Sequence, residues 1–366
     1  MVENDDVERS AGRTWSRPLA AAGDLTRREV LLLAAVWLSG GFGSGLSRPT
    51  EVDRMSDHEI TSGGGQGQPD AAAVRTAPPG EVQTALDEAG THRRSRVELV
   101  TETVYQPTET WQIPSGVTLA YNGAAVELQR DVDVHDIAPG ACVEQPYVDL
   151  RPVFGYGSSV FRFDSARHGF YGSNPAWHVR GGFTRGRSGE GTLYEFAQGG
   201  ETAIYFVRVD HTVHGIGTVV DMHRGDRYGI NGVRVSGVWY DFQTGIRMRN
   251  RDAVSGAVDN ISGNHFDVVA QPDESDILWD LEVGKFNVLR GRIWDYSEYT
   301  DVMWRVHGSG SDKRIGNMLY WFPVGSVEER LVDRIGPRVF DDRLGDPRNR
   351  VVVPWLQGRP VGDFSG

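Results

Sequence analysis

One short pattern of residues recurs along the chain. The segment 237–242 reads GVWYDF, and the later segment 291–296 reads GRIWDY. Apolar or aromatic residues also recur at a constant interval, at Trp239, Phe266, Ile293 and Tyr320. A period in the twenties within short β-type runs predicts a solenoid, because one coil of chain buries its inner face only against the coils above and below it.

The composition favours strands over helices. The chain has 46 glycines among its 366 residues, and its short apolar runs are β-branched and aromatic with Gly, Asn and Asp between them. This length accommodates two domains or one large β domain. We therefore expect an all-β protein in which each coil carries two or three strands.

Four asparagines lie near the expected coil boundaries. They are Asn231, Asn264, Asn287 and Asn317. Their amides either bond to one another along the stack or belong to ordinary turns. Both interpretations are structural and neither involves a ligand.

The N-terminal region, residues 1–46, predicts export. Arg27 and Arg28 precede an apolar stretch from Val30 to about Leu38, and small residues follow. This order is typical of a twin-arginine export signal, and an amphipathic helix that starts with two arginines is the alternative. The stretch is shorter than the ~20 apolar residues of a membrane span. We expect an extracellular or cell-surface protein with no membrane span beyond this region.

The rest of the chain divides into three parts. Residues 47–80 are poor in apolar side chains and rich in Gly, Pro and Asp, which predicts a flexible linker. Residues 81–325 are expected to form the folded domain, beginning with a short helix over 81–89. Residues 326–366 are expected to cap the last open strand edge of the solenoid.

The start of this domain resembles a known superfamily. The expected helix is followed by the strand VELV at 97–100, the segment IPSGVTL from Ile113, and NGA from Asn122. This order resembles the opening of pectin-lyase-like proteins, over about residues 80–325. The resemblance implies a single-stranded right-handed parallel β-helix with a short N-terminal capping helix, and it implies acidic polysaccharide as the substrate class. The Asn-Thr-Asp, Gly-His-Gly and Arg-Ile-Lys motifs of polygalacturonases are absent.

The charge of the chain excludes some partners. The formal net charge is −12, and an acidic surface repels phosphate backbones, so nucleic acid is not an expected partner. Lys285 and Lys313 are the only lysines, and this arginine bias with abundant Asp indicates a GC-rich or halophilic source. The single cysteine, Cys142, excludes an internal disulfide and is expected to be a small buried residue.

A pair of carboxylates is the first catalytic hypothesis. Asp241 and Asp295 take equivalent places in the two copies of the repeat. If these copies are two coils apart, their backbones are about 9–10 Å apart, which suits the general acid and general base of an inverting glycosidase. Asp267 is expected on the coil between them, one place out of register. The alternative is that all three are solvent-facing acids on an acidic protein.

Aromatic residues near these acids predict a platform for sugar rings. Flat side chains with a polar tip suit the C–H faces of pyranoses. Side chains alternate between the two faces of a strand, so Ile293 and Asp295 point to the same side. If Ile293 points into the core, Asp295 does too unless the strand bends. The predicted platform comprises Tyr240, Trp294, Tyr296 and Trp321.

A second cluster lies in the segment VDHTVHGIGTVVDMH. Imidazole and carboxylate groups at these spacings are possible ligands of a divalent metal, with structural or exposed histidines as the alternative. The triplet VDH weakly resembles the IDH stretch of one pectate lyase family, which implies a possible Ca²⁺ requirement. The predicted ligands are Asp210, His211, His214, Asp221 and His223.

Two functions follow from these features. One is an exported glycoside hydrolase or polysaccharide lyase that acts on extracellular polysaccharide. The other is a non-catalytic adhesin or spike-like protein that binds glycans. The sequence leaves the glycan, the metal requirement and a possible homo-oligomer open.

Overall fold

The structure, a computed structural model, describes residues 74–92, 95–170, 177–200, 202–225, 228–250, 261–271, 277–293, 302–308, 315–323, 340–343, 348–352 and 363–365. They all belong to one compact unit, Gly67–Gly366. The predicted export signal and residues 47–73 of the predicted linker lie outside the described residues. So do Trp294, Asp295 and Tyr296.

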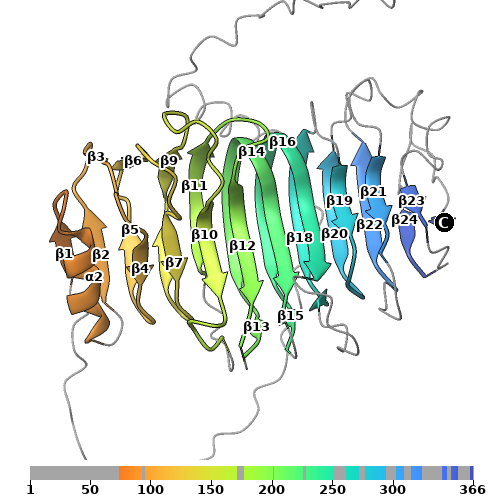
Figure 1. The fold of residues 1–366 in the computed structure, drawn as a ribbon, viewed down its shortest axis with the longest axis horizontal. Coiled ribbons are helices and arrows are strands. Elements are labelled where there is room, and N and C mark those ends of the chain that lie inside the picture. Colours follow the sequence, from red (N-terminus) through yellow and green to blue (C-terminus); the bar gives the residue numbers. More distant parts are fainter. Residues whose placement is uncertain are drawn as a thin grey trace, which may run out of the picture. The chain divides into compact units, whose positions relative to one another are not determined.

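The described chain is a parallel β-solenoid, as the sequence predicts. Strands from successive coils lie side by side in chain order (Figure 1). The first wall comprises β2 (Arg96–Leu99), β5 (Thr118–Ala120), β8 (Cys142–Glu144), β11 (Val179–Arg185), β14 (Arg208–Arg224), β16 (Arg234–Asn250), β18 (His265–Gln271), β20 (Val288–Ile293), β22 (Met318–Pro323) and β24 (Arg350–Val352).

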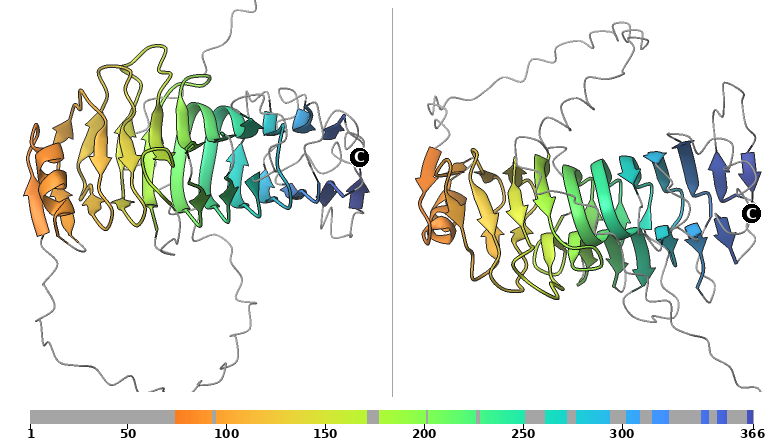
Figure 2. Two further views of the ribbon diagram at one scale, coloured as in Figure 1. Left: turned by 60° about the horizontal axis from the view of Figure 1, so that its bottom comes forward. Right: turned by 90° about the horizontal axis from the view of Figure 1, so that it is seen from above.

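The second wall faces the first across the core. It comprises β4 (Trp111–Ile113), β7 (His135–Ile137), β10 (Ser159–Asp164), β12 (Thr192–Gln198), the later parts of β14 and β16, β19 (Ile277–Leu281), β21 (Val302–Val306) and β23 (Phe340–Asp342). Both β14 and β16 run through the two walls, and Figure 2 shows the walls from two further directions.

Short strands complete the coils. Strands β3 (Val104–Tyr105), β6 (Ala125–Glu127) and β9 (Tyr147–Asp149) lead to β11, and a separate small sheet comprises β13 (Ile204–Tyr205), β15 (Ile230–Asn231) and β17 (Ile261–Ser262). At the C-terminal end β25 (Asp363–Ser365) pairs with β24 in the antiparallel sense.

The N-terminal end has the predicted helix. Helix α2 (Val82–Gly90) turns Val82, Leu86 and Ala89 inward over the first coils. Strand β1 (Val74–Ala77) lies inside the segment predicted as linker and pairs with β2 along its whole length. Backbone pairing, with Ala77 alone buried, orders this segment despite its low apolar content.

The coils differ in length, so the predicted constant interval is wrong. Arg234 pairs with His265, and His265 pairs with Val288, which lies a shorter distance along the chain. The repeat of the GVWYDF pattern is nevertheless real, because Gly237 pairs with Val268 and Val268 with Gly291. The constant interval is the mean of two unequal coils.

We call a row of residues that pair with one another from coil to coil a file. Because the coils differ in length, the files contain other residues than the constant interval predicts. Trp239 pairs with Ala270, which pairs with Ile293, whereas Phe266 pairs with Val235. One inner file runs through the first wall, and all its members are buried. It comprises Val97, Leu119, Val143, Val179, Val209, Val235, Phe266, Leu289, Leu319 and Val351.

Buried asparagines bond along the stack, which confirms one of the two predicted roles. The Asn264 amide donates to the Asn287 side-chain oxygen at 3.0 Å, and Asn287 donates in the same way to Asn317 at 3.0 Å. Asn317 donates to Asn349 at 3.1 Å, a member that the constant interval missed. Each amide also donates to a backbone carbonyl of the preceding coil, such as Ile261 for Asn287 at 3.1 Å.

Asn231 is not part of this ladder. Its side-chain oxygen accepts from the backbone N–H and hydroxyl of Ser262, and it is only half-buried. The ladder position in its coil belongs to Val233, whose N–H donates to the Asn264 side chain at 2.9 Å. The ladder therefore begins at Asn264.

We predict that Asn287→Ala lowers the free energy of unfolding by about 2–4 kcal/mol, because it leaves buried donors and acceptors on both sides of the ladder without partners. Urea unfolding measures this loss. The matched control is Asn231→Ala, which removes the same side chain from the half-buried turn and is expected to cost less than about 1 kcal/mol. Equal losses in the two variants would contradict the role of the ladder.

Candidate functional site

Of the predicted acid pair, only Asp241 lies among the described residues. Asp241 lies between Tyr240 and Phe242, whose partners in the preceding coil are His214 and Ile216. It therefore takes the place of Gly215, and both residues have a positive φ, of 51° and 77°. Asp is one of the few residues that tolerate this conformation, so its position follows from the corner of the coil.

Asp267 is not where the sequence placed it. It pairs with Ser236, which precedes Asp241 on the same strand, and it is exposed on the first wall. The error follows from the unequal coils, because the constant interval aligned Phe266 with Trp239. The position of Asp295 lies outside the described residues.

The predicted aromatic platform is wrong for Trp321. This side chain is fully buried, and its indole N–H donates to the carbonyl of Ile293 at 3.4 Å. It pairs with Gly291, where a side chain would collide with Ile293. Tyr240 is half-buried with its ring 6.4 Å from that of His214. The other two members, Trp294 and Tyr296, lie outside the described residues.

The predicted metal ligands lie in separate places. His211 points into the core, where it is bonded to Thr184 and to the carbonyl of Gly181, both at 2.8 Å. Burial lowers its pKa to about 4, so the ring is neutral near pH 7. His214 is exposed beside Tyr240.

The remaining three predicted ligands lie on two different walls. Asp210 accepts from the Ser236 hydroxyl at 3.1 Å on the first wall. Asp221 and His223 belong to the second wall. No group of three or more His, Cys, Asp or Glu side chains within the described ranges is arranged to hold a metal ion.

Cys142 is half-buried on the first wall. Burial, together with the charge of Glu144, raises the pKa of its thiol to about 12. The protonated thiol is a poor nucleophile, although the residue is less buried than the sequence predicted.

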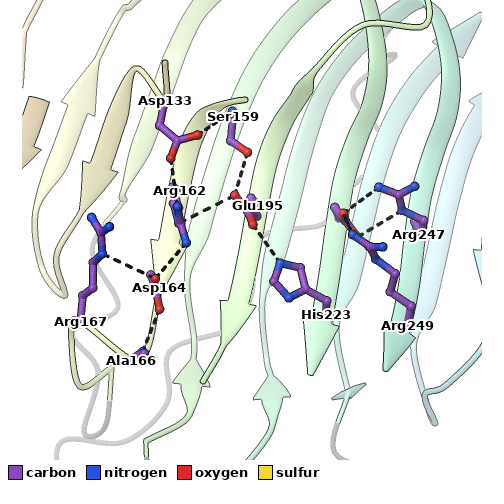
Figure 3. Close-up of polar contacts among 11 residues, drawn as sticks. Asp133, Ser159, Arg162, Asp164, Ala166, Arg167, Glu195, His223, Arg247 and Arg249 are labelled. Carbon is purple, nitrogen blue, oxygen red and sulfur yellow. Dashed lines mark hydrogen bonds and ion pairs between the residues drawn. The ribbon is translucent and has the colours of Figure 1, made fainter. Parts of the chain in front are cut away.

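A row of charged side chains crosses the outer face of the second wall. We call it the charged ribbon, and Figure 3 shows its central part. Each member pairs in register with the next along adjacent strands, and acids alternate with arginines except at one step. The ribbon comprises Asp136, Arg162, Glu195, Asp221, Arg247, Asp280 and Arg305.

The charges of this ribbon neutralise one another between coils. The Asp221 carboxylate lies 2.8 Å from Nη2 of Arg247 and 2.8 Å from Nη2 of Arg249. Glu195 accepts from the Ser159 hydroxyl at 2.8 Å and contacts His223 Nε2 at 2.9 Å. These acids hold neighbouring coils together and already have cationic partners.

The first coils of the ribbon repeat this arrangement. Arg162 lies 3.0 Å from Asp133 and 3.1 Å from Asp164. Arg167 lies 2.8 Å from the fully buried Asp136. The carboxylates of the ribbon are therefore tied to arginines along its length.

The pKa values at the centre of the ribbon oppose a role in proton donation. Burial raises the pKa of Glu195, but hydrogen bonds from His223 and Ser159 and the charge of Arg162 outweigh it and lower the pKa to about 2. For Asp136 too, contacts with His168 and Arg167 outweigh burial and lower the pKa. A general acid needs a raised pKa, so we interpret the ribbon as a clamp.

The sequence contains a weak signal for this ribbon. Except for Asp136, which follows His135, its members are single charged residues between buried apolar neighbours, as in Phe161-Arg162-Phe163 and Leu278-Trp279-Asp280-Leu281. Their partners lie on neighbouring coils, at sequence intervals that vary from one coil to the next. Without the true register the ion pairs are not predictable.

We predict that the clamp weakens in acid. The pKa of Glu195 is lower in the folded chain than its ordinary value of 4.5, so the stability it contributes is present above pH 4.5 and is lost as the pH falls toward about 2. Glu195→Gln should lower the free energy of unfolding by about 2 kcal/mol at pH 7, and this difference should shrink below pH 4. Glu190→Gln, a loop acid, is the control. A difference that does not depend on pH would contradict the assignment.

The outer face of the first wall has a different charge balance. We call its four arginines and one histidine the basic face, comprising Arg208, Arg234, His265, Arg290 and Arg292. Neither Arg234 nor Arg290 forms an ion pair with a carboxylate among the described residues. Burial lowers the pKa of His265, and the charges of these two arginines lower it further. A local positive potential therefore exists on a chain with a net charge of −12.

Aromatic rings lie within the basic face. The Arg290 guanidinium is 5.5 Å from the ring centre of Tyr320, its partner on the next coil. The Arg208 guanidinium is 6.0 Å from the ring centre of Trp177, which is exposed. The face thus combines cations with flat apolar surfaces.

Two acids also share a file on this face. Asp210 pairs with Ser236, and Ser236 pairs with Asp267. Their backbones are thus two coils apart, about 9–10 Å. This spacing is the same as the one predicted for Asp241 and Asp295.

Comparisons of the chain with protein-family models, curated proteins and solved structures found no match. None of the helices in the described part of the chain has the length and apolar character to span a membrane.

Proposed function

We propose that this chain is an exported, non-catalytic protein that binds acidic polysaccharide along its basic face. The observation that carries this proposal is the exposed pair Arg234 and Arg290, which have no carboxylate ion pair among the described residues and lie close to His265, whose pKa is lowered by burial and further by their charges. Cations without partners on an acidic protein attract anions, and the acidic surface around them restricts where a polyanion docks.

The chemistry of the face suits a linear polyanion. Guanidinium groups bind carboxylates or sulfates through paired hydrogen bonds, and the rings of Tyr320 and Trp177 offer flat faces to sugars. Cations repeat on consecutive coils, as with Arg208 and Arg234, which pair directly. A polymer with repeating charges can contact several of them at once.

The sequence supports the wider setting of this proposal. The parallel β-solenoid and helix α2 agree with the resemblance to pectin-lyase-like proteins, which implies acidic polysaccharide as the ligand class. The arginine pair at 27–28 and the apolar stretch after it support export to the cell surface or beyond. Binding without cleavage belongs to the adhesin-like alternative of the two functions.

We predict that Arg234→Gln together with Arg290→Gln weakens binding of polygalacturonate, alginate or hyaluronate by about tenfold or more, because two charge-assisted contacts are lost. Calorimetry at low and high salt measures this change, and the affinity of the unmodified protein should fall with salt. Arg75→Gln, which changes a half-buried arginine on β1 that pairs with Glu88, is the control away from this face. Equal binding of neutral dextran and acidic chains would overturn the proposal.

Cleavage is a second candidate, favoured by the file that contains Asp210 and Asp267. The backbones of these two acids are about 9–10 Å apart by register, a separation that suits the carboxyl pair of an inverting glycosidase. Neither residue is one of the clamped acids of the charged ribbon.

If the second candidate is correct, the unmodified protein releases reducing ends from an acidic polysaccharide, and Asp210→Asn with Asp267→Asn abolishes that release, by at least about 100-fold. A reducing-sugar assay measures it, with Asp241→Asn as the matched control at the corner. Release that persists in the double variant would remove this pair, and binding without release supports the non-catalytic function.

A further inference from the structure

Two phenylalanines have a backbone conformation that bulky residues rarely adopt. Phe206 and Phe286 both have a φ of 57°. Glycine has no penalty there, and Asn or Asp tolerate it, but an aromatic residue with a positive φ is an outlier. Strain of this kind persists only where the surrounding structure imposes it, and it is common at sites that bind ligands.

Both phenylalanines take the same place in their coils. Pairing of Tyr205 with Asn231, of Asn231 with Ser262 and of Ser262 with Lys285 fixes the register of this corner. The residues that follow these four form one file with positive φ throughout. The file comprises Phe206, Gly232, Gly263 and Phe286, and Gly316 follows it on the next coil.

A positive φ favours glycine at each of these positions, yet phenylalanine takes two of them. A side chain on Gly232 would collide with the Phe206 ring, and one on Gly316 would collide with the Phe286 ring. Each ring thus lies against the glycine of the following coil. This contact leaves 55% of Phe206 and 57% of Phe286 exposed, so packing accounts for only part of each ring.

Polar groups border the aromatic file on both sides. On one side the preceding residues of the coils supply the Asn231 amide and the Lys285 ammonium. On the other side, a little further along each coil, lie Arg208, Arg234 and His265 of the basic face. The exposed rings are therefore continuous with the proposed binding surface.

We propose that Phe206 and Phe286 are stacking sites for two sugar rings of one acidic polysaccharide chain that runs along the solenoid axis at this corner. The inference rests on the proposed function and extends it to the orientation of the ligand. Three coil steps separate the rings, about 14 Å at ~4.8 Å per step, which is the length of a short oligosaccharide.

The arrangement favours a glycan over an apolar partner. A protein or lipid surface requires a contiguous apolar patch, whereas Gly232 and Gly263 separate the two rings and hydrogen-bond donors flank them. A pyranose has an apolar face ringed by hydroxyl groups, so it matches a flat ring next to an amide, an ammonium and guanidinium groups.

Replacement by glycine separates a binding role from a structural one. Phe206→Gly with Phe286→Gly introduces the residue that the same file has in its other described coils, so the chain should fold with an unchanged or higher urea midpoint. Affinity for polygalacturonate, alginate or hyaluronate should fall about tenfold, and each single variant should lose part of it. Phe154→Gly removes an exposed phenylalanine elsewhere and should leave binding unchanged.

The outcomes distinguish the two proposals. If the unmodified protein binds none of the three polysaccharides, the proposed function fails and this inference fails with it. If binding depends on Arg234 and Arg290 but the double glycine variant binds normally, the inference alone is overturned. If the double glycine variant has a lower urea midpoint but binds glycans normally, the rings serve packing. If the unmodified protein binds phosphatidylcholine vesicles and the double glycine variant does not, while glycan binding is unchanged, the rings belong to a lipid-binding surface.

Discussion

The parallel pairing of each coil with the next is the constraint on which every other feature depends. It sets a step of about 4.8 Å and forces like positions of successive coils into vertical files. Within a file, side chains must suit each other as well as their own coil. Inner files therefore collect valines and leucines, the buried corner collects asparagines whose amides both donate and accept, and the outer face of the second wall collects acids next to arginines.

This constraint also separates structural charges from available ones. Along the charged ribbon neighbouring coils supply partners for each other, as with Asp221 between Arg247 and Arg249, so the charges are satisfied internally. On the basic face Arg234 and Arg290 have no carboxylate ion pair among the described residues, although Asp210 and Asp267 lie on the same face. The same geometry thus produces a clamp on one wall and the proposed binding surface on the other.

The sequence predicted the fold because solenoid patterns are local to each coil. Strand alternation, turn glycines and buried asparagines such as Asn287 are visible without knowledge of the register. The assignment of sites failed where it depended on the register. A constant interval placed Asp267 beside Asp241 and Trp321 on the surface, whereas the lengths of the connecting segments displace both. The strained backbone of Phe206 and Phe286 has no sequence signature at all.

The unequal coils have an evolutionary consequence. The segment that joins Arg234 to its partner His265 is longer than the one that joins His265 to Val288, yet strand register is kept. Insertions and deletions between strands therefore change the rim without disturbing the wall. Descendants of such a chain can diversify the rim while inheriting the paired wall, because selection acts on the two parts almost independently.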